Sequence, residues 1–217
     1  MIRQRWKRLQ AHIRNREFPA GGAGKAGRPA YPSTRTWRLL EAGFLLADLV
    51  FVPEILLSLN RLFKPNTRRL NEREIAVARA VFGETIDYHK VRIDERAMTG
   101  CRQYGFAYVG FNCINCWGKL SDAHFVHEMV HIWQFQTLGS RYIPRALWAQ
   151  RTPEGYNYGG VQALQQALRE GRGLSGFNFE QQGDVVADYF CLQNGLQPRW
   201  CDANPAYLPV FEAIVKF

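Results

Sequence analysis

The sequence predicts an α+β fold in which helices dominate, with a small antiparallel sheet and an N-terminal helical extension. Several segments place apolar residues at helical spacing and end at glycine, whereas only residues 90–94 and 106–112 have the pattern of strands. The chain of 217 residues is 47% hydrophobic, which suffices for a buried core. We expect a basic flexible tail at residues 1–36, an apolar helical extension at 37–66 and one folded domain at 67–217.

Positive charge is concentrated at the start of the chain. Between Met1 and Arg35, nine basic residues accompany one acidic residue, which accounts for +8 of the formal net charge of +9. The remainder is nearly neutral, so we expect no nucleic-acid-binding surface across the fold. Residues 20–29 are glycine-rich and too poor in apolar side chains to pack, which predicts a linker or disorder. Residues 3–16 fit either a basic amphipathic helix for an acidic partner or membrane surface, or a flexible tail.

The most apolar segment is residues 39–62. Charged residues and Pro53 interrupt it well short of the ~20 apolar residues that a bilayer span requires. Glycine and proline follow the basic start of the chain where a secretory signal peptide would have an apolar core, so we expect no signal peptide. We predict two core helices divided near Pro53, with an interfacial or partner-binding helix as the alternative.

Further helices are predicted on both sides of the centre of the chain. Apolar residues recur at helical spacing in residues 71–82, 160–170 and 204–217. The strand-like segments 90–94 and 106–112 would form the small antiparallel sheet. It would lie beside a helix at residues 120–138, in which neither proline nor glycine occurs. Ser121 or Asp122 could cap that helix, and Gly139 could end it.

The helix at 120–138 carries the motif HExxH at His127, Glu128 and His131. On a helix, residues four apart lie on one face, so both imidazoles could bind one metal ion. The side chain of Glu128 points about 100° away from that of His127, where it could reach a water at the metal's open position as a general base. The alternative is a core helix on which the two histidines share a face by chance.

A catalytic zinc ion takes three protein ligands, so two histidines are incomplete. Glu180, Asp184 and Asp188 share one helical stripe farther along the chain. We expect Glu180 to be the third ligand and Asp184 to orient a ligating histidine, while Asp188 could replace either. His124 is a reserve ligand. The competing interpretation of the stripe is an acidic solvent face.

HExxH followed by ExxxD resembles the gluzincin class of zincin metallopeptidases. Residues 70–83, 91–94, 107–111 and 127–134 are similar to the metallopeptidase domain called the extracellular contractile injection system core, and residues 156–160 and 177–189 resemble VgrG-related proteins. The resemblance covers roughly residues 68–192 and implies a zinc-dependent peptidase associated with type VI or related secretion systems. The run Cys113–Cys116 departs from the plain edge strand expected before the metal helix.

The expected activity is peptide-bond hydrolysis by a water that Zn²⁺ activates, with Glu128 as general base. The second electrophile would be Tyr156, Tyr158 or His89. Expected partners are a protein or peptide substrate, a secretion-system spike or an immunity protein, with membrane contact through the N-terminal region and no nucleic acid. The chain would be cytoplasmic in the producing bacterium and exported by a contractile secretion system. A silent zinc-binding adaptor and a membrane-acting effector are the alternatives.

Five cysteines leave at least one thiol unpaired within the chain. Cys113, Cys116, Cys191 and Cys201 could hold a second, structural zinc ion. Disulfides would be favoured if the chain were exported after folding, and reduced core thiols in the cytoplasm.

Overall fold

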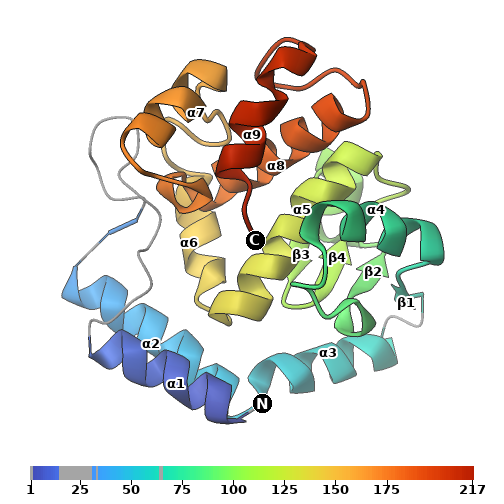
Figure 1. Cartoon of the computed structure of the whole chain (residues 1–217). Coiled ribbons are helices and arrows are strands. Elements are labelled where there is room, and N and C mark those ends of the chain that lie inside the picture. Colours follow the sequence, from blue (N-terminus) through green and yellow to red (C-terminus); the bar gives the residue numbers. More distant parts are fainter. Residues whose placement is uncertain (1, 15–30, 33, 64–65) are drawn as a thin grey trace.

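The computed structural model describes residues 2–14, 31–32, 34–63 and 66–217 (Figure 1). The predicted linker at residues 20–29 lies outside the described residues. The helices are α1 (Ile2–Ile13), α2 (Arg35–Leu49), α3 (Val52–Phe63), α4 (Glu72–Phe82), α5 (Asp122–Leu138), α6 (Tyr142–Ala149), α7 (Gly160–Arg169), α8 (Phe179–Gln193) and α9 (Leu208–Ile214). Short helical turns occupy Tyr88–Lys90, Met98–Arg102, Leu174–Gly176 and Pro205–Tyr207. The helix-dominated α+β class is confirmed.

The sheet is mixed, so its predicted antiparallel character was only partly right. Its strands are β1 (Arg68–Arg69), β2 (Arg92–Asp94), β3 (Tyr108–Gly110) and β4 (Cys113–Asn115), in the order β1-β2-β4-β3. Strand β4 pairs with β2 in parallel and with β3 antiparallel, and β1 pairs with β2 antiparallel. The two predicted strands therefore do not pair with each other. Strand β4 lies between them because all three of its residues are buried, and β3 is left at the sheet edge.

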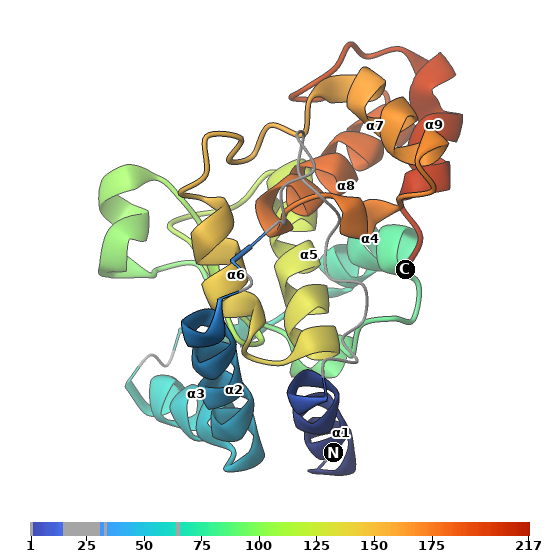
Figure 2. The same cartoon turned by 90° about the vertical axis from the view of Figure 1, so that its left-hand side faces the viewer.

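Helices α5 and α8 lie side by side at the centre of the molecule (Figures 1 and 2). They bury apolar residues against each other and the surrounding elements, including Val126 and Val130 of α5 and Val185 and Val186 of α8. Helix α5 has the predicted limits, because the Ser121 side chain accepts a hydrogen bond from the backbone N–H of His124 and the helix ends before Gly139. These two helices bring together the residues of the candidate site.

Helices α1, α2 and α3 form the end of the molecule opposite α7 and α9 (Figures 1 and 2). Of the two alternatives for the first residues, the structure shows the helix, which packs along α2 and buries Leu9 and His12. The break between α2 and α3 falls just before Val52, and Pro53 is the second residue of α3, a position that proline tolerates. The predicted division into two helices near Pro53 is confirmed, but their placement in the core is only partly right, since Leu45 is buried whereas Leu39 and Leu62 are 73% and 76% exposed.

No single helix in the described part of the chain is long and apolar enough to cross a membrane. Helix α2 and residues 52–59 of α3 reach that length and composition together, but the pair is bent by 66°.

The five cysteines are present as thiols, and four of them are buried. Of the alternatives for the cysteines, the second zinc site does not form, since among the described residues no set of cysteines is gathered closely enough to hold a metal ion. Cys113 lies on β4 and Cys191 on α8, so the two halves of the expected ligand set belong to different elements.

Candidate metal centre

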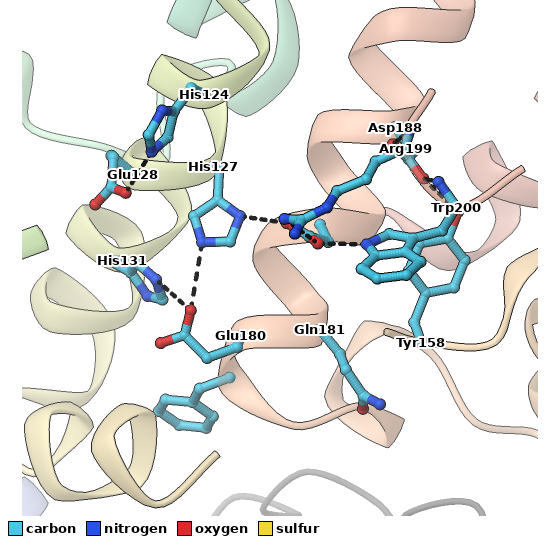
Figure 3. Close-up of polar contacts among 12 residues, drawn as sticks. His124, His127, Glu128, His131, Tyr158, Glu180, Gln181, Asp188, Arg199 and Trp200 are labelled. Atoms are coloured by element: carbon cyan, nitrogen blue, oxygen red, sulfur yellow. Dashed lines mark hydrogen bonds and ion pairs between the residues drawn. The ribbon is translucent and has the colours of Figure 1, made fainter. Parts of the chain in front are cut away.

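The structure brings His127, His131 and Glu180 together as one buried group whose donor atoms lie within 4.8 Å of one another. The Nε2 atoms of His127 and His131 each lie 3.4 Å from Oε2 of Glu180 (Figure 3). This spacing is long for a charge-assisted hydrogen bond. It agrees with the separation of about 3.3 Å between two donor atoms on a tetrahedral zinc ion.

Asp184 fixes the ring of His127. Its Oδ1 accepts a hydrogen bond of 2.8 Å from Nδ1 of His127. In the neutral ring, a hydrogen on Nδ1 leaves the lone pair on Nε2, which points toward Glu180. Oδ2 of Asp184 accepts hydrogen bonds from the indole of Trp200 and from Arg199. The carboxylate that orients the histidine is therefore itself held in place.

Gln134 fixes the orientation of the His131 ring. Its Oε1 lies 2.8 Å from Nδ1 of His131, and its Nε2 donates to the carbonyl of Phe179 and to Oε1 of Gln182. Because both donor contacts come from Nε2, the amide has one consistent orientation, with its oxygen toward the histidine. Both rings thus carry a hydrogen on Nδ1 and present Nε2 to Glu180.

Gly183 allows α5 and α8 to approach each other at the site. A Cβ atom at this position would meet Cε1 and Nδ1 of the His127 ring at 2.5 and 2.6 Å. Helix α8 begins at the cap residue Asn178, where the Asn178 and Gln181 side chains each accept the other's backbone N–H. This cap places Glu180 in the first turn, beneath the two histidines.

The charges of the site favour a cation at its centre. Burial lowers the pKa of His127, but the hydrogen bond to Asp184 and the negative charges of Glu180 and Glu128 outweigh it and raise the pKa to about 10. Burial raises the pKa of Glu180, whereas the neighbouring His131 and His127 hold it well below its usual range. A divalent ion bound at the Nε2 atoms would replace the protons that these carboxylates attract.

The group opens into a cleft of about 1090 Å³, lined by β3, α5, α6 and α8. Glu128 lines the cleft beside the two histidines, and its buried Oε2 has no hydrogen-bond partner among the described residues. A buried carboxylate oxygen without a partner is costly, and such atoms mark positions where water or a ligand binds. Glu128 is thus where a base should be if a water occupied the cleft next to the histidines.

Two predicted substitutes for the ligands serve other purposes. Asp188 accepts hydrogen bonds from the hydroxyl of Tyr158 and from the backbone N–H groups of Arg199 and Trp200. It therefore anchors the loop that carries the partners of Asp184. His124 lies outside the donor group, with Nε2 3.4 Å from Oε1 of Glu128, and its side chain is partly exposed.

Of the three tyrosine and histidine candidates for a second electrophile, only Tyr156 lines the cleft. Its ring centroid lies 5.9 Å from that of His127, and burial raises the pKa of its hydroxyl, which stays a donor. The Tyr158 hydroxyl is occupied by Asp188, and His89 is exposed outside the cleft.

Sequence reasoning missed Gln134, Gly183 and the pair Arg199 and Trp200. Gln134 had a signal, since it lies three residues after His131 on the same helix, where their side chains can meet. A glycine inside a predicted helix also indicates a close approach. Arg199 and Trp200 come from a loop, and no local pattern connects them with Asp184.

No family model matches the sequence. The chain is 31% identical over 151 residues to the type VI secretion system spike protein VgrG2b of Pseudomonas aeruginosa, a match that covers 58% of this chain and spans 13% of that protein. Among solved structures, it is similar to the effector domain of Pseudomonas aeruginosa VgrG2b, with 27% identity, a TM-score of 0.42, and coverage of 69% of this chain and 84% of that chain. The chain is thus similar in sequence to a part of VgrG2b and spans a small share of that protein's length.

Proposed function

We propose that the chain is a zinc-dependent metallopeptidase with His127, His131 and Glu180 as zinc ligands and Glu128 as general base. The observation that carries the proposal is the buried donor group, in which both histidine Nε2 atoms stand 3.4 Å from one glutamate oxygen. The unpartnered Oε2 of Glu128 in the same cleft supports catalysis over a purely structural ion. A structural zinc site is closed by four protein ligands, whereas three donors gather here among the described residues.

When bound, zinc supplies Lewis acidity, which lowers the pKa of a water at its open position to ~7 and polarises a carbonyl. Glu128 accepts the proton of the attacking water at its unpartnered oxygen and passes it to the leaving amine. Asp184 and Gln134 keep the Nε2 atoms of the two histidines directed at the centre. The hydroxyl of Tyr156 donates a hydrogen bond to the oxygen that becomes negative in the transition state.

The proposed substrate is an extended peptide. The cleft is larger than is needed for a small metabolite, and β3 forms both a wall of the cleft and the edge of the sheet. An edge strand can pair with an extended segment through main-chain hydrogen bonds. One acceptor of this edge is occupied, because the Tyr142 hydroxyl donates to the carbonyl of Val109.

The proposal includes delivery as an effector of a type VI secretion system. Its support is the similarity to VgrG2b, which is a spike protein of such a system. A secretion-system spike is accordingly the proposed partner.

Removal of zinc tests the proposal. We expect about one zinc ion per purified chain by mass spectrometry, and loss of casein cleavage when a phenanthroline chelator strips it. The isomer of the chelator that cannot bind metal should have no effect, and added zinc should restore cleavage. Stripping should also lower the melting temperature by about 2–4 °C for each kcal/mol of zinc binding energy. A metal-free protein that cleaves casein at the same rate would exclude the proposed mechanism.

Replacing Gln134 with Leu is expected to weaken zinc binding by about 10- to 100-fold, because His131 then loses the acceptor that orients its ring. Competition with a coloured zinc chelator measures the affinity. Gln193→Leu is the matched control, since the side chain of Gln193 donates to the Tyr189 hydroxyl at the exposed end of α8, away from the metal centre. Equal affinities for the two variants would show that Gln134 does not position the ligand.

A further inference from the structure

Helix α2 directs its two acidic residues and Leu45 inward, and its leucines Leu39, Leu40 and Leu46 outward. Glu41 and Asp48 are 1% and 3% exposed, whereas Leu39 and Leu46 are 73% and 52% exposed. A surface helix of a water-soluble domain has the opposite arrangement, with its apolar stripe against the core. The outer face of α2 thus has the composition of a surface that is covered by an apolar medium.

Buried polar contacts fix this rotation of α2. Glu41 accepts hydrogen bonds from Arg145 of α6 and from the indole of Trp37. Asp48 accepts from the backbone N–H and the hydroxyl of Ser140, in the turn before α6. Turning the leucines inward would expel both carboxylates from these partners and leave Arg145 buried without its acid, which is strongly destabilising. The leucines therefore face outward because the contacts of Glu41 and Asp48 with Arg145 and Ser140 fix the orientation of α2.

Helix α3 extends the apolar surface. Ile55, Leu59 and Leu62 are exposed and follow one another at helical spacing on one face. On α1, the indole of Trp6 is also exposed. Both views place the three helices at the same end of the molecule (Figures 1 and 2). We call the exposed faces of α1, α2 and α3 the basal surface.

The basal surface carries an excess of positive charge. In the described part of α1, α2 and α3, all three acidic residues make internal contacts, since Glu54 pairs with Arg5 while Glu41 and Asp48 are buried. The exposed cations are Arg3 and Lys7 of α1, Arg14 just after it and Arg35 of α2, whereas Glu54, whose side chain is 40% exposed, is neutralised by Arg5. A second copy of the chain would bring like charges together on the same surface. An anionic bilayer would satisfy both the leucines and the cations.

We propose that the basal surface docks on an anionic lipid bilayer, with α2 and α3 lying in its interface. The bend of 66° between these helices prevents them from forming one straight span. It suits two short helices that lie along a membrane, with apolar side chains among the acyl chains and cations at the headgroups. The inference does not depend on the metal centre, which α5 and α8 form.

Flotation of the full chain with vesicles tests the proposal. The protein should float with vesicles of three parts phosphatidylcholine to one part phosphatidylglycerol, and much less with phosphatidylcholine alone. The double variant Leu46→Glu/Leu59→Glu should stay in the bottom fraction. Leu196→Glu introduces the same change at a leucine with 46% exposure elsewhere on the molecule, and it should float like the wild type. Lys7→Ala should weaken binding to anionic vesicles about fivefold.

Circular dichroism must show that the double variant melts like the wild type. A wild-type chain that stays at the bottom with anionic vesicles would overturn the proposal, as would a double variant that floats equally well. Light scattering tests the alternative that a second copy of the chain covers the basal surface, because it measures the oligomeric state. A dimer that Leu46→Glu/Leu59→Glu dissociates, without flotation of the wild type, would assign the basal surface to a second copy.

Discussion

Replacing Glu128 with Gln is expected to reduce kcat for casein or peptide cleavage by about 10²- to 10⁴-fold, the usual contribution of a general base. The amide cannot accept a proton from the attacking water, and it cannot deliver one to the leaving amine. The zinc content should not change, because Glu128 is not among the three donors of the metal centre. A lower kcat with an unchanged zinc content would identify Glu128 as a base, whereas the loss of a ligand would lower both.

The substitution should be well tolerated by the fold. Glu128 lies within α5, and the amide has almost the same volume as the carboxylate. The buried Oε2 has no partner to lose, and its neighbour Oε1 lies 3.4 Å from Nε2 of the partly exposed His124. The carboxylate of Glu128 therefore does not hold α5 to another helix, so the melting temperature should stay close to that of the wild type.

Steady-state kinetics on zinc-loaded protein is the measurement, with metal analysis of each preparation. Glu84→Gln is a matched control, because Glu84 is exposed after α4 and outside the cleft. It should cleave like the wild type. Equal cleavage by Glu128→Gln would end the peptidase proposal and leave the zinc-binding adaptor as the better interpretation.

The helix that carries the motif could be predicted closely because its information is local. Ser121 and Gly139 mark its ends, and the spacing of His127 and His131 defines one face of any helix. The stripe that starts at Glu180 was recognised for the same reason. That the two helices meet there was suggested by chemistry, since three carboxylates on one stripe need a positive charge opposite them.

The sheet could not be predicted as well because its pairing is not local. Strand β4 is three residues long and lies between β2 and β3, although β3 precedes it in the chain. A segment of that length gives too few alternations to define a strand. The parallel pairing of β2 with β4 depends on the path of residues 95–112, which no pattern in the strands specifies.

Helix α2 shows a different limit of sequence analysis. Its apolar content was visible, but the sequence does not show which apolar residues meet the core, since Leu45 is buried whereas Leu39 and Leu46 are exposed. The two acidic residues Glu41 and Asp48 were interpreted as interruptions of an apolar run. They are instead the inward contacts to Arg145 and Ser140, which lie about a hundred residues later. Such partners become visible only when the chain is folded.

Replacing Gly183 with Ala is expected to reduce zinc affinity by at least about 10- to 100-fold and to abolish measurable cleavage. The added methyl group would lie 2.5 Å from Cε1 of His127 and 2.8 Å from its Nε2, distances that real Cβ atoms do not show. Either the His127 ring leaves its position against Asp184, or α5 and α8 move apart. Both responses separate Nε2 of His127 from Glu180.

The expected change in the stability of Gly183→Ala has the opposite sign to the change that helix propensity predicts. Alanine is preferred over glycine inside a helix by about 1 kcal/mol, so helix propensity alone predicts that the variant would be more stable. Overpacking a filled interior costs about 1–3 kcal/mol, and at Gly183 it should exceed the gain in propensity. We therefore expect a net loss of stability at a position where propensity predicts a gain.

Gly43→Ala is the control that isolates the propensity term. Gly43 is also inside a helix, and a Cβ atom there would have no neighbour within 4 Å. That variant should be more stable by about 0.5–1 kcal/mol and should bind zinc like the wild type. Urea unfolding and zinc competition on both variants are the measurements. If Gly183→Ala instead gained stability and kept its zinc affinity, the ring of His127 would not be packed on α8, and the ligand geometry proposed for the metal centre would be incorrect.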